Sequence, residues 1–330
     1  MSWHKSLALL VTASALALAG CGGGGGGGGG TNFTPRPPST PTPTPTSAAV
    51  TIFPQPSAGE YASVGVSIAG SGGNLDTYAN DTDRFGPVTS ADTEQMHIRY
   101  AQAGYYEIQM PGSAWDRLVH YGGLLNATSD NNYFQPSGVA MNQGYLVISN
   151  SAKWDDYSYS EMGSWGSASA SRYGGTAFGV PTQASAVPTT GSATFDGKVQ
   201  GSADIMQADN LYGGYAPLSV DGTVNLNFNF SAGTLAGQMT LFGPDGMNPF
   251  EIGSFAFNDT VFSVGSATYS GKFDSAAPGE NFFLGRFTGP NAEELIGAWA
   301  VPFLFTKGGE LVPADGQVHQ AFGAWIAKRP

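Results

Sequence analysis

Apolar and polar side chains alternate most regularly in the last third of the chain, in residues 223–230 (TVNLNFNF). Asparagines there separate apolar residues: Val224, Leu226, Phe228 and Phe230. Because the side chains of a strand point alternately to its two faces, this period of two predicts one buried face and one face in water. The turn residues SAGT then lead into LAGQMTLFG (235–243), so the two segments are predicted to form a hairpin.

Short strand-like segments of the same kind recur on both sides of this hairpin. They are GSATFDGKVQGSA, EIGSFAF, GSATYSGKF, NFFLGRF, GAWAVPFLF and QAFGAWIAK. About eight strands without long helices predict an antiparallel barrel, because closure removes the exposed edges of an open sheet. Glycines inside these segments are typical of the sharp bends at barrel corners: Gly237, Gly271, Gly285 and Gly323.

Residues 50–187 have a less regular pattern, in which short strands are separated by long loops. AGYYEIQM (103–110) and GYLVISN (144–150) are predicted strands, whereas SAWDRLVHYGGL fits either a strand or a helical turn. The predicted fold class is therefore all-β, with a β-rich domain over residues 50–187 followed by an antiparallel β-barrel of about eight strands over residues 188–330.

The stretch GRFTGPNAEELIGAWA interrupts the strand pattern with residues typical of a helix start. Pro290 presets a helical φ, and the carboxylates of Glu293 and Glu294 suit the positive end of a first turn. We predict one turn of helix here, with Leu295 turned inward to close the barrel mouth and Gly297 releasing the chain into the next strand. This role is structural and requires no catalysis.

The N-terminus has the pattern of a secretory signal peptide over residues 1–20, with one lysine, a short apolar run and then small residues. The run is too short to span a bilayer as a mature helix. Its end, LAGC, resembles the bacterial lipobox, which implies cleavage between Gly20 and Cys21 and attachment of a diacylglycerol to the sulfur. Acyl chains there would anchor the protein in a membrane, at about 0.8 kcal/mol per buried CH₂. By resemblance to Gram-negative lipoproteins, Gly22 in place of Asp implies sorting to the outer membrane.

Residues 21–49 are predicted to form a tether. Glycines from Gly22 to Gly30 are followed by TNFTPRPPSTPTPTPTS, in which Pro and Thr alternate. The glycines are flexible and the Pro-rich part is semi-rigid, advancing about 3.1 Å per residue, and neither part buries a core. We expect the tether to hold the folded part away from the membrane.

Composition and charge narrow the classes of function. The chain of 330 residues has a net charge of −12 and a pI of about 4.5, so it would repel a phosphate backbone and nucleic-acid binding is not expected. Its 48 glycines, 20 phenylalanines and 14 tyrosines favour short strands and tight turns over packed helices. Cys21 is the only cysteine in the sequence, so no intramolecular disulfide can form and the fold depends on its buried core.

The stretch that begins at Gly285 matches the hallmark of a known family, which reads approximately G-x-F-Y-G-P-x-A-x-E-L-G-G. The matching positions are Gly285, Phe287, Gly289, Pro290, Ala292, Glu294, Leu295 and Gly297. Thr288 and Ile296 depart from the hallmark. The chain therefore resembles the barrel domain of transferrin-binding protein B and related bacterial surface lipoproteins, which include haem-binding and complement-factor-binding members. PTTGSATFDGKVQG (188–201) and QAFGAWIAKR (320–329) are similar to the family's first and last barrel strands.

The resemblance implies a lobe of two parts, a β-rich handle over residues 50–187 followed by the barrel. It also implies display on the Gram-negative cell surface and capture of a host protein or an iron source. A binding protein of this kind would pass its cargo to a transporter, and a TonB-dependent receptor encoded next to it would support this function. The binding residues of the family lie in variable loops, and no motif carries them over to this chain.

Motifs of enzyme chemistry are absent from the sequence, which has no P-loop, no G-x-S-x-G and no H-E-x-x-H. His97, His120 and His319 lack the spacing of metal ligands, so neither an enzyme nor a metal site is expected. His97, His120 or a tyrosine from Tyr105 and Tyr106 could ligate haem iron, or all could be ordinary strand and loop residues. Haem or small-molecule binding stays open as an alternative function, as does a structural or adhesive surface module.

Aromatic residues gather on a polar, Gly/Ser-rich stretch before the barrel: Trp154, Tyr157, Tyr159, Trp165 and Tyr173. Tyrosine and tryptophan in such surroundings are typical of recognition surfaces. The same rings could instead cover the flank of the barrel. The sequence leaves both interpretations open.

Overall fold

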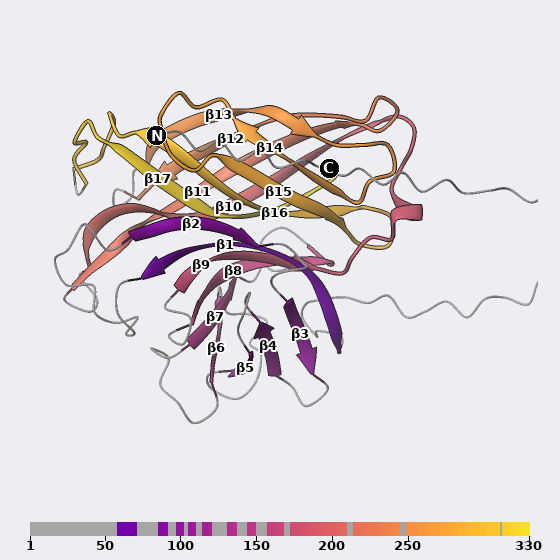
Figure 1. Cartoon of the computed structure of the whole chain (residues 1–330), viewed down its shortest axis with the longest axis horizontal. Helices are drawn as coiled ribbons and strands as arrows, with labels where there is room; N and C mark the ends of the chain where they lie inside the picture. The colour runs from indigo at the N-terminus through magenta and orange to yellow at the C-terminus, as the bar shows by residue number, and fades with distance from the viewer. Residues whose placement is uncertain are drawn as a thin grey trace, which may run out of the picture. The chain divides into compact units, whose positions relative to one another are not determined.

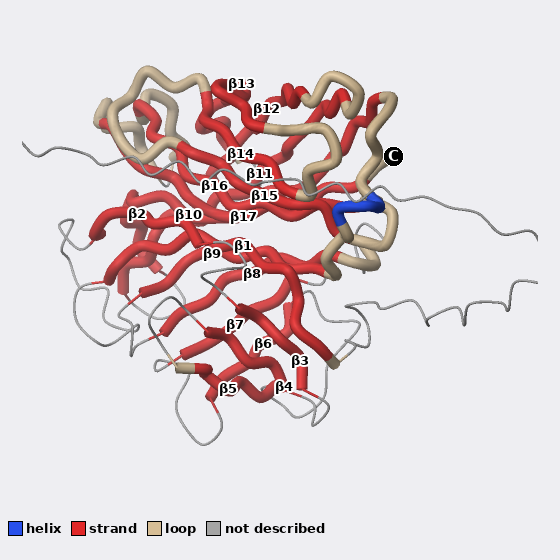
Figure 2. Tube along the Cα trace, turned by 45° about the vertical axis from the view of Figure 1, so that its right-hand side comes forward, coloured by secondary structure: helices blue, strands red, loops and turns tan. Residues whose placement is uncertain are grey.

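The computed structural model describes residues 58–70, 85–91, 97–101, 105–109, 114–120, 131–136, 144–149, 157–167, 172–209, 214–244, 249–310 and 312–330. All of them belong to one compact unit, Ser47–Pro330. Strands dominate these residues (Figure 2), and the one helix among them is the short 3₁₀ helix η3 (Ala184–Ala186). No helix in the described part of the chain is long and apolar enough to cross a membrane. The predicted all-β fold class is confirmed, while the signal peptide, the tether and Trp154 lie outside the described residues.

The handle is a sheet that closes on itself. Its strands are β1 (Gly59–Gly70), β2 (Phe85–Ala91), β3 (His97–Ala101), β4 (Tyr105–Gln109), β5 (Trp115–His120), β6 (Asn131–Pro136), β7 (Gly144–Ser149), β8 (Ser160–Ser167) and β9 (Arg172–Gly179). Strands β3 to β9 pair in chain order, and β1 pairs with both β3 and β9. The result is a closed ring of strands, and β2 is attached to it by its pairing with β1. Strands were predicted in this region, but their closure into a ring was not.

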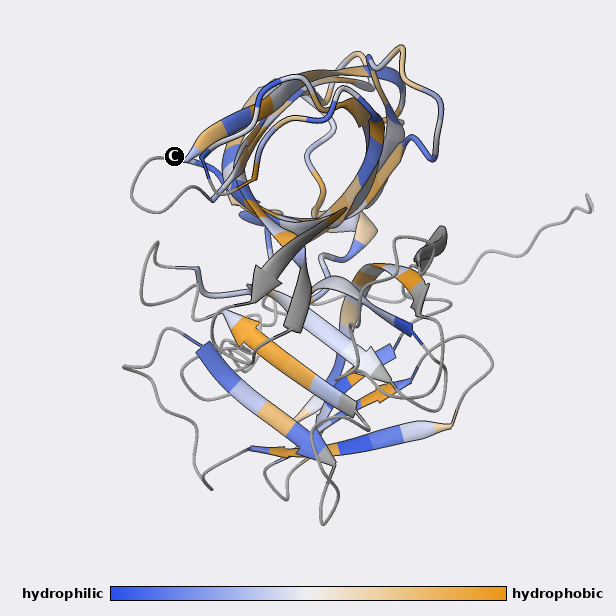
Figure 3. Ribbon diagram, turned by 90° about the vertical axis from the view of Figure 1, so that its left-hand side faces the viewer, coloured by the Kyte–Doolittle hydropathy of each residue, from blue (hydrophilic) through white to orange (hydrophobic). Residues whose placement is uncertain are grey.

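The C-terminal part is a closed antiparallel barrel. Its strands are β10 (Ser192–Asp209), β11 (Gly214–Asn229), β12 (Thr234–Gly243), β13 (Phe250–Val261), β14 (Thr268–Phe273), β15 (Phe282–Thr288), β16 (Glu294–Leu304) and β17 (Val318–Lys328). They pair in chain order and β17 returns to β10 (Figure 1), so the barrel seen end-on is a ring (Figure 3). This confirms the predicted eight-stranded barrel. The apolar side chains of TVNLNFNF point into the barrel core, as their alternation predicts.

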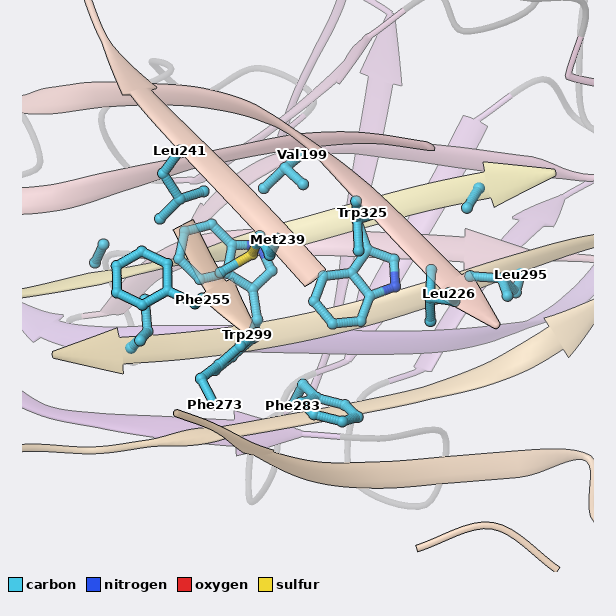
Figure 4. Close-up of a cluster of buried hydrophobic side chains, with 14 of the residues drawn as sticks. Val199, Leu226, Met239, Leu241, Phe255, Phe273, Phe283, Leu295, Trp299 and Trp325 are labelled. Atoms are coloured by element: carbon cyan, nitrogen blue, oxygen red, sulfur yellow. The ribbon is translucent and has the colours of Figure 1, made fainter. Parts of the chain in front are cut away.

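Aromatic and aliphatic side chains from every strand fill the barrel interior (Figure 4). Trp299 and Trp325 are fully buried there, and the ring of Trp325 stacks on Phe257 with centroids 5.9 Å apart. Burying a large apolar side chain contributes about 1.5–3 kcal/mol, so this interior supplies much of the stability of a chain that has no intramolecular disulfide. The barrel is a packed core.

Strands β16 and β17 are buried on both faces. One face packs into the barrel interior, and the other carries Ile296, Ala298 and Ile326 against the handle residues Val64 and Ala177. A strand covered on both sides has no wet face, which explains why ELIGAWAVPFL and AFGAWIA are nearly continuous apolar runs.

The glycine at position 285 gives an aromatic ring room to approach. A Cβ on Gly285 would lie 2.3 Å from the ring of Tyr269 and 2.4 Å from the carbonyl oxygen of Ile296. The Tyr269 hydroxyl donates to that same carbonyl at 3.0 Å. At this position of the barrel wall, the close approach of a ring requires the glycine.

The predicted turn of helix after Pro290 is wrong. Residues 289–292 form a turn between β15 and β16, with φ of 85° at Gly289 and 56° at Ala292. Both values are left-handed, and a right-handed helix does not accommodate them. The Glu293 carboxylate accepts the backbone N–H of Asn291 at 2.8 Å, so it stabilises the turn locally.

Leu295 and Gly297 follow this turn as residues of β16. Leu295 is fully buried in the barrel interior, so its predicted inward direction is confirmed. Gly297 lies inside the sheet, opposite Gly285 of β15 and Trp325 of β17, and not at the exit from a helix.

Candidate functional site

The hallmark stretch joins the handle to the barrel through a buried carboxylate. Glu294 is 4% exposed and accepts the backbone N–H groups of Ser158 at 2.7 Å and Tyr159 at 3.1 Å. Next to it, the hydroxyls of Ser160 and Thr288 lie 2.6 Å apart. The stretch that leads into β8 is thus fixed to the start of β16.

The backbone of Gly289 completes this connection. Its N–H donates to the carbonyl of Val180 at 2.8 Å, and its carbonyl accepts the Thr182 hydroxyl at 2.6 Å. We call the whole set the motif junction: Ser158, Tyr159, Ser160, Val180, Thr182, Thr288, Gly289 and Glu294. The hallmark positions Gly289 and Glu294 therefore contact the segments on either side of the last handle strands.

Burial raises the pKa of Glu294, and the hydrogen bonds from Ser158, Ser160 and Tyr159 and the charge of Lys328 oppose that shift. The carboxylate is enclosed by donors of its own chain. Glu294 therefore acts as a structural link between the handle segment before β8 and the barrel strand β16.

Two of the aromatic residues before the barrel lie between the handle and the barrel. Tyr157 is 4% exposed, and its hydroxyl donates to the carbonyl of Ile326 at 3.3 Å. Tyr173 packs against Phe322 with ring centroids 6.3 Å apart. Both rings belong to the buried cluster that covers the outside of β16 and β17, as in the interpretation that they cover the barrel flank.

The other aromatic residues of this set are placed differently. Trp165 is buried in the handle interior, and Tyr159 is partly exposed at the motif junction. Trp154 lies outside the described residues. The described rings are not brought together on one surface, so we do not propose them as a shared binding site.

The candidate haem ligands do not converge. The Nδ1 atom of His97 lies 2.6 Å from a carboxylate oxygen of Glu60, and Tyr106 is packed in the handle core. His120 Nε2 lies 3.1 Å from the side-chain oxygen of Asn132. Among the described residues no group of His, Cys, Asp and Glu could hold a metal ion. These contacts assign no axial ligand, and we derive no haem chemistry from them.

A cleft of about 340 Å³ lies between handle strands β7 to β9 and barrel strands β10 and β11. Ser149 of the handle donates to Gln200 of the barrel at 2.6 Å, and both residues line the cleft. The candidate haem ligands do not line it. The cleft is large enough to take a small molecule. Of the aromatic residues singled out in the sequence, Tyr173 lines it, next to Phe322.

Strands β3, β4 and β5 present charged and aromatic side chains on the outer face of the handle. We call these residues the handle patch: Arg99, Tyr105, Glu107, Trp115 and Arg117. In the sheet register Arg99 stands opposite Glu107, and Glu107 stands opposite Arg117. The Arg99 guanidinium donates to the Glu107 carboxylate and lies 4.0 Å from the centroid of the Trp115 ring. The Arg117 guanidinium lies 3.8 Å from the centroid of Tyr105.

Each guanidinium of the patch is held against a flat ring, and that of Arg99 also by a carboxylate. A group held in this way loses little conformational entropy when a partner binds. The side chain of Arg99 is 42% exposed and Arg117 is exposed, so both remain accessible. Arginine, tryptophan and tyrosine are the residues that most often dominate binding at protein interfaces. The handle patch therefore has the composition and the preorganisation of a protein-binding surface.

This surface cannot be recognised from the sequence alone. The only local indication of it is that charged or aromatic residues stand at alternate positions in three segments: HIRYA, YYEIQ and WDRLVH. The pairing register that brings the three strands into one surface is not visible in the sequence.

No family model and no curated protein matches this chain. Solved structures with a similar fold include transferrin-binding protein B of Haemophilus parasuis Hp5, as a double mutant. It is 12% identical with a TM-score of 0.39, over 83% of this chain and 76% of that chain. Transferrin-binding protein B of serogroup B Neisseria meningitidis is 12% identical with a TM-score of 0.36, over 73% of this chain and 52% of that chain. HpuA of Kingella denitrificans, solved in complex with human haemoglobin, is 13% identical with a TM-score of 0.37, over 83% of this chain and 88% of that chain. The likeness is at the level of fold, and the ligand of this chain does not follow from it.

Proposed function

We propose that this protein is a lipid-anchored binding protein of the outer membrane, displayed on the cell surface, which captures a protein or iron-bearing ligand for uptake. The LAGC sequence after an apolar leader supports lipid attachment at Cys21. A Pro/Thr-rich segment such as residues 31–47 spans roughly 50 Å when extended, which supports display away from the membrane. A TonB-dependent receptor is the proposed acceptor of the cargo.

The handle patch is the observation that carries the capture step. Because side chains fill the barrel interior, a macromolecular ligand binds on the outside of the lobe. The patch offers two oriented guanidinium groups with aromatic rings beneath them, on a molecule whose net charge is −12. Such a surface suits a protein partner that places carboxylates and apolar groups side by side.

Binding to two iron-carrying proteins tests this proposal. We would immobilise the chain from residue 21 onward, with Cys21→Ser to keep it free of lipid, and measure retention of transferrin and of haemoglobin by surface plasmon resonance. At least one of them should bind, and the double change Arg99→Ala and Arg117→Ala should weaken that binding at least about tenfold. Lys272→Ala, which removes an exposed cation from barrel strand β14, is the matched control and should leave binding unchanged.

Circular dichroism and thermal unfolding would show that each variant is folded. Retention of neither protein by the folded chain would count against capture of these iron carriers. Equal binding by the double variant and the parent chain would remove the handle patch from the proposal.

A further inference from the structure

His319, near the start of β17, has a carboxylate on each of its ring nitrogens. Nδ1 lies 2.9 Å from Oδ1 of Asp204, and Nε2 lies 2.9 Å from Oδ2 of Asp315. A neutral imidazole carries one N–H and can donate to only one of these carboxylates. Both hydrogen bonds together require the imidazolium, so the arrangement specifies a protonated histidine.

The two carboxylates belong to segments that are far apart in the chain. Asp204 lies in β10, beside the irregularity in the β10–β11 pairing between Ala203 and Met206. Asp315 lies in the connection between β16 and β17, which we call the mouth loop (residues 305–310 and 312–317). The imidazolium is therefore the link between the mouth loop and a strand of the barrel wall.

The mouth loop closes the barrel core at this end. Phe305 and Val312 are 2% and 5% exposed and belong to the interior cluster of the barrel. The N–H of Phe305 donates to the carbonyl of Gln317 at 2.8 Å, and the N–H of Gly316 donates to the carbonyl of Phe305 at 2.9 Å. The His319 ring itself packs edge-on against Phe305, with centroids 5.9 Å apart.

We propose that His319 is a proton-operated latch, whose imidazolium holds the mouth loop against β10 and whose deprotonation releases Asp315 and loosens the loop. The neutral ring can keep its hydrogen bond to Asp204, because that carboxylate is the less exposed of the two (26% against 46%) and is fixed on the barrel wall by the N–H of Gln320 at 2.9 Å. The backbone N–H that fixes Asp315, that of Gln317 at 2.8 Å, belongs to the mouth loop itself. The bond to Asp315, on the loop, is then the one that is lost. Loosening the loop exposes the apolar end of the barrel core.

The surroundings of His319 agree with this role. The hydrogen bond to Asp204 is the largest cause that raises the pKa of His319, burial opposes it, and the bond to Asp315 raises it further. Asp204 on β10 and Asp315 on the mouth loop are the charged groups that face the ring, and Phe303 of β16 and Phe305 pack against it. A histidine with a raised folded pKa stabilises the fold fully below its unfolded pKa, and this contribution is lost as the pH rises through the folded pKa. The latch is thus closed in acid and opens in the alkaline direction.

Hydrogen exchange and NMR together test the latch. In the chain from residue 21 onward with Cys21→Ser, ¹⁵N NMR would follow the titration of His319. Exchange of the Phe305 and Gly316 amides, corrected for its intrinsic pH dependence, should rise about tenfold as His319 loses its proton, whereas amides of β11 should not respond. The pH of the transition should lie above that of an ordinary histidine.

Two variants decide between a latch and a merely structural contact. Asp315→Ala, which leaves no side-chain partner for Nε2, should give fast exchange in the mouth loop at every pH and lower the pH at which His319 titrates. Glu251→Ala, which removes an exposed carboxylate from β13, is the matched control and should change neither. A neutral His319 ring at mildly acidic pH would overturn the proposal. So would amide exchange in the mouth loop that changes neither with the titration of His319 nor with the Asp315→Ala substitution.

Discussion

Gly175 of β9 and Gly323 of β17 meet backbone to backbone where the handle packs on the barrel. A Cβ on Gly175 would lie 2.9 Å from the Cα atom and 3.0 Å from the carbonyl carbon of Gly323. Such contacts are shorter than real Cβ atoms tolerate, so the close approach of the two strands depends on the absence of a side chain at Gly175. A Cβ on Gly323 would instead meet the backbone of β10, 2.0 Å from the carbonyl oxygen of Gln200. The buried cluster around this point is made largely of alanine, valine and isoleucine.

Gly175→Ala should lower the free energy of unfolding by about 2 kcal/mol, because the added methyl group forces two backbones apart. Denaturant unfolding followed by tryptophan fluorescence measures the change. Gly253→Ala is the matched control, since its Cβ would meet only the edge of the Phe255 ring at 3.0 Å. We expect it to cost about 0.5 kcal/mol, and an equal loss in both variants would contradict the argument.

Glu294→Ala should destabilise the protein by about 3 kcal/mol, because the N–H groups of Ser158 and Tyr159 would lose their acceptor. Glu294→Gln retains one oxygen and should cost about half as much. Glu293→Ala is the control that removes the neighbouring carboxylate. That carboxylate accepts hydrogen bonds only from the exposed Asn291 among the bonds described, so its loss should lower the free energy of unfolding by less than about 0.5 kcal/mol. Thermal and denaturant unfolding of the three variants would show the order, and equal losses for Glu293 and Glu294 would refute it.

The raised pKa of Glu294 also sets a pH dependence. Between its usual value of 4.5 and the folded pKa, the folded state binds more protons than the unfolded state. The contribution of Glu294 to stability therefore falls as the pH rises through this window, and it is constant above the window. The difference in unfolding free energy between the wild type and Glu294→Gln, measured from about pH 4 to about pH 8, should decline and then level. A difference that grows with pH would show that the hydrogen bonds outweigh burial.

The architecture could be predicted where the pattern is local. TVNLNFNF has a period of two, and β11 buries the apolar set that this period selects. The turn at Gly289 could not be predicted in the same way. Pro290, Asn291 and the two acids after them have a local preference for a helix start, but Gly289 is bonded to Thr182, which lies 107 positions away. Bonds of such range have no local signal, and here they outweigh the propensity of the segment.

The candidate sites show the same limit. A tyrosine such as Tyr157 or Tyr173 suits a recognition surface and a packed interior equally well. These two belong to a buried cluster because β16 and β17 lie against them, which the sequence does not show. Arg99 and Trp115 are not adjacent in sequence, and their contact depends on the register of β3, β4 and β5. The sequence shows which residue types are present, but it does not show which residues become neighbours across the strands of a sheet.

Gly289→Ala should lower the free energy of unfolding more than a substitution that only strains the backbone. Gly289 has a φ of 85°, and its Cβ would lie 2.8 Å from the Tyr159 ring and 2.5 Å from the Glu293 carboxylate. Gly191→Ala is the matched control, because Gly191 has a similar φ of 77° but nothing within 4 Å of its Cβ position. We expect a loss of about 1 kcal/mol at Gly191 and about 2–3 kcal/mol at Gly289, measured by denaturant unfolding. Equal losses would mean that the motif junction has room for a side chain.

Cys21→Ser should release the protein from the membrane. Each buried CH₂ contributes about 0.8 kcal/mol, so several acyl chains on Cys21 would anchor the chain firmly, and serine carries no thioether-linked lipid. Metabolic labelling with an alkyne fatty acid, followed by separation of the two membranes, should show label and outer-membrane location in the wild type and neither in the variant.

Gly22→Asp is the control that separates anchoring from sorting. It leaves Cys21 in place, so the chain should keep its label, but by resemblance to Gram-negative lipoproteins it should stay in the inner membrane. Protease treatment of intact cells should then degrade the wild type and spare the Gly22→Asp variant, because we expect only the wild type to reach the surface. A Cys21→Ser protein that still fractionates with the outer membrane would show that something other than lipid holds the lobe there, and the proposed anchor would have to be abandoned.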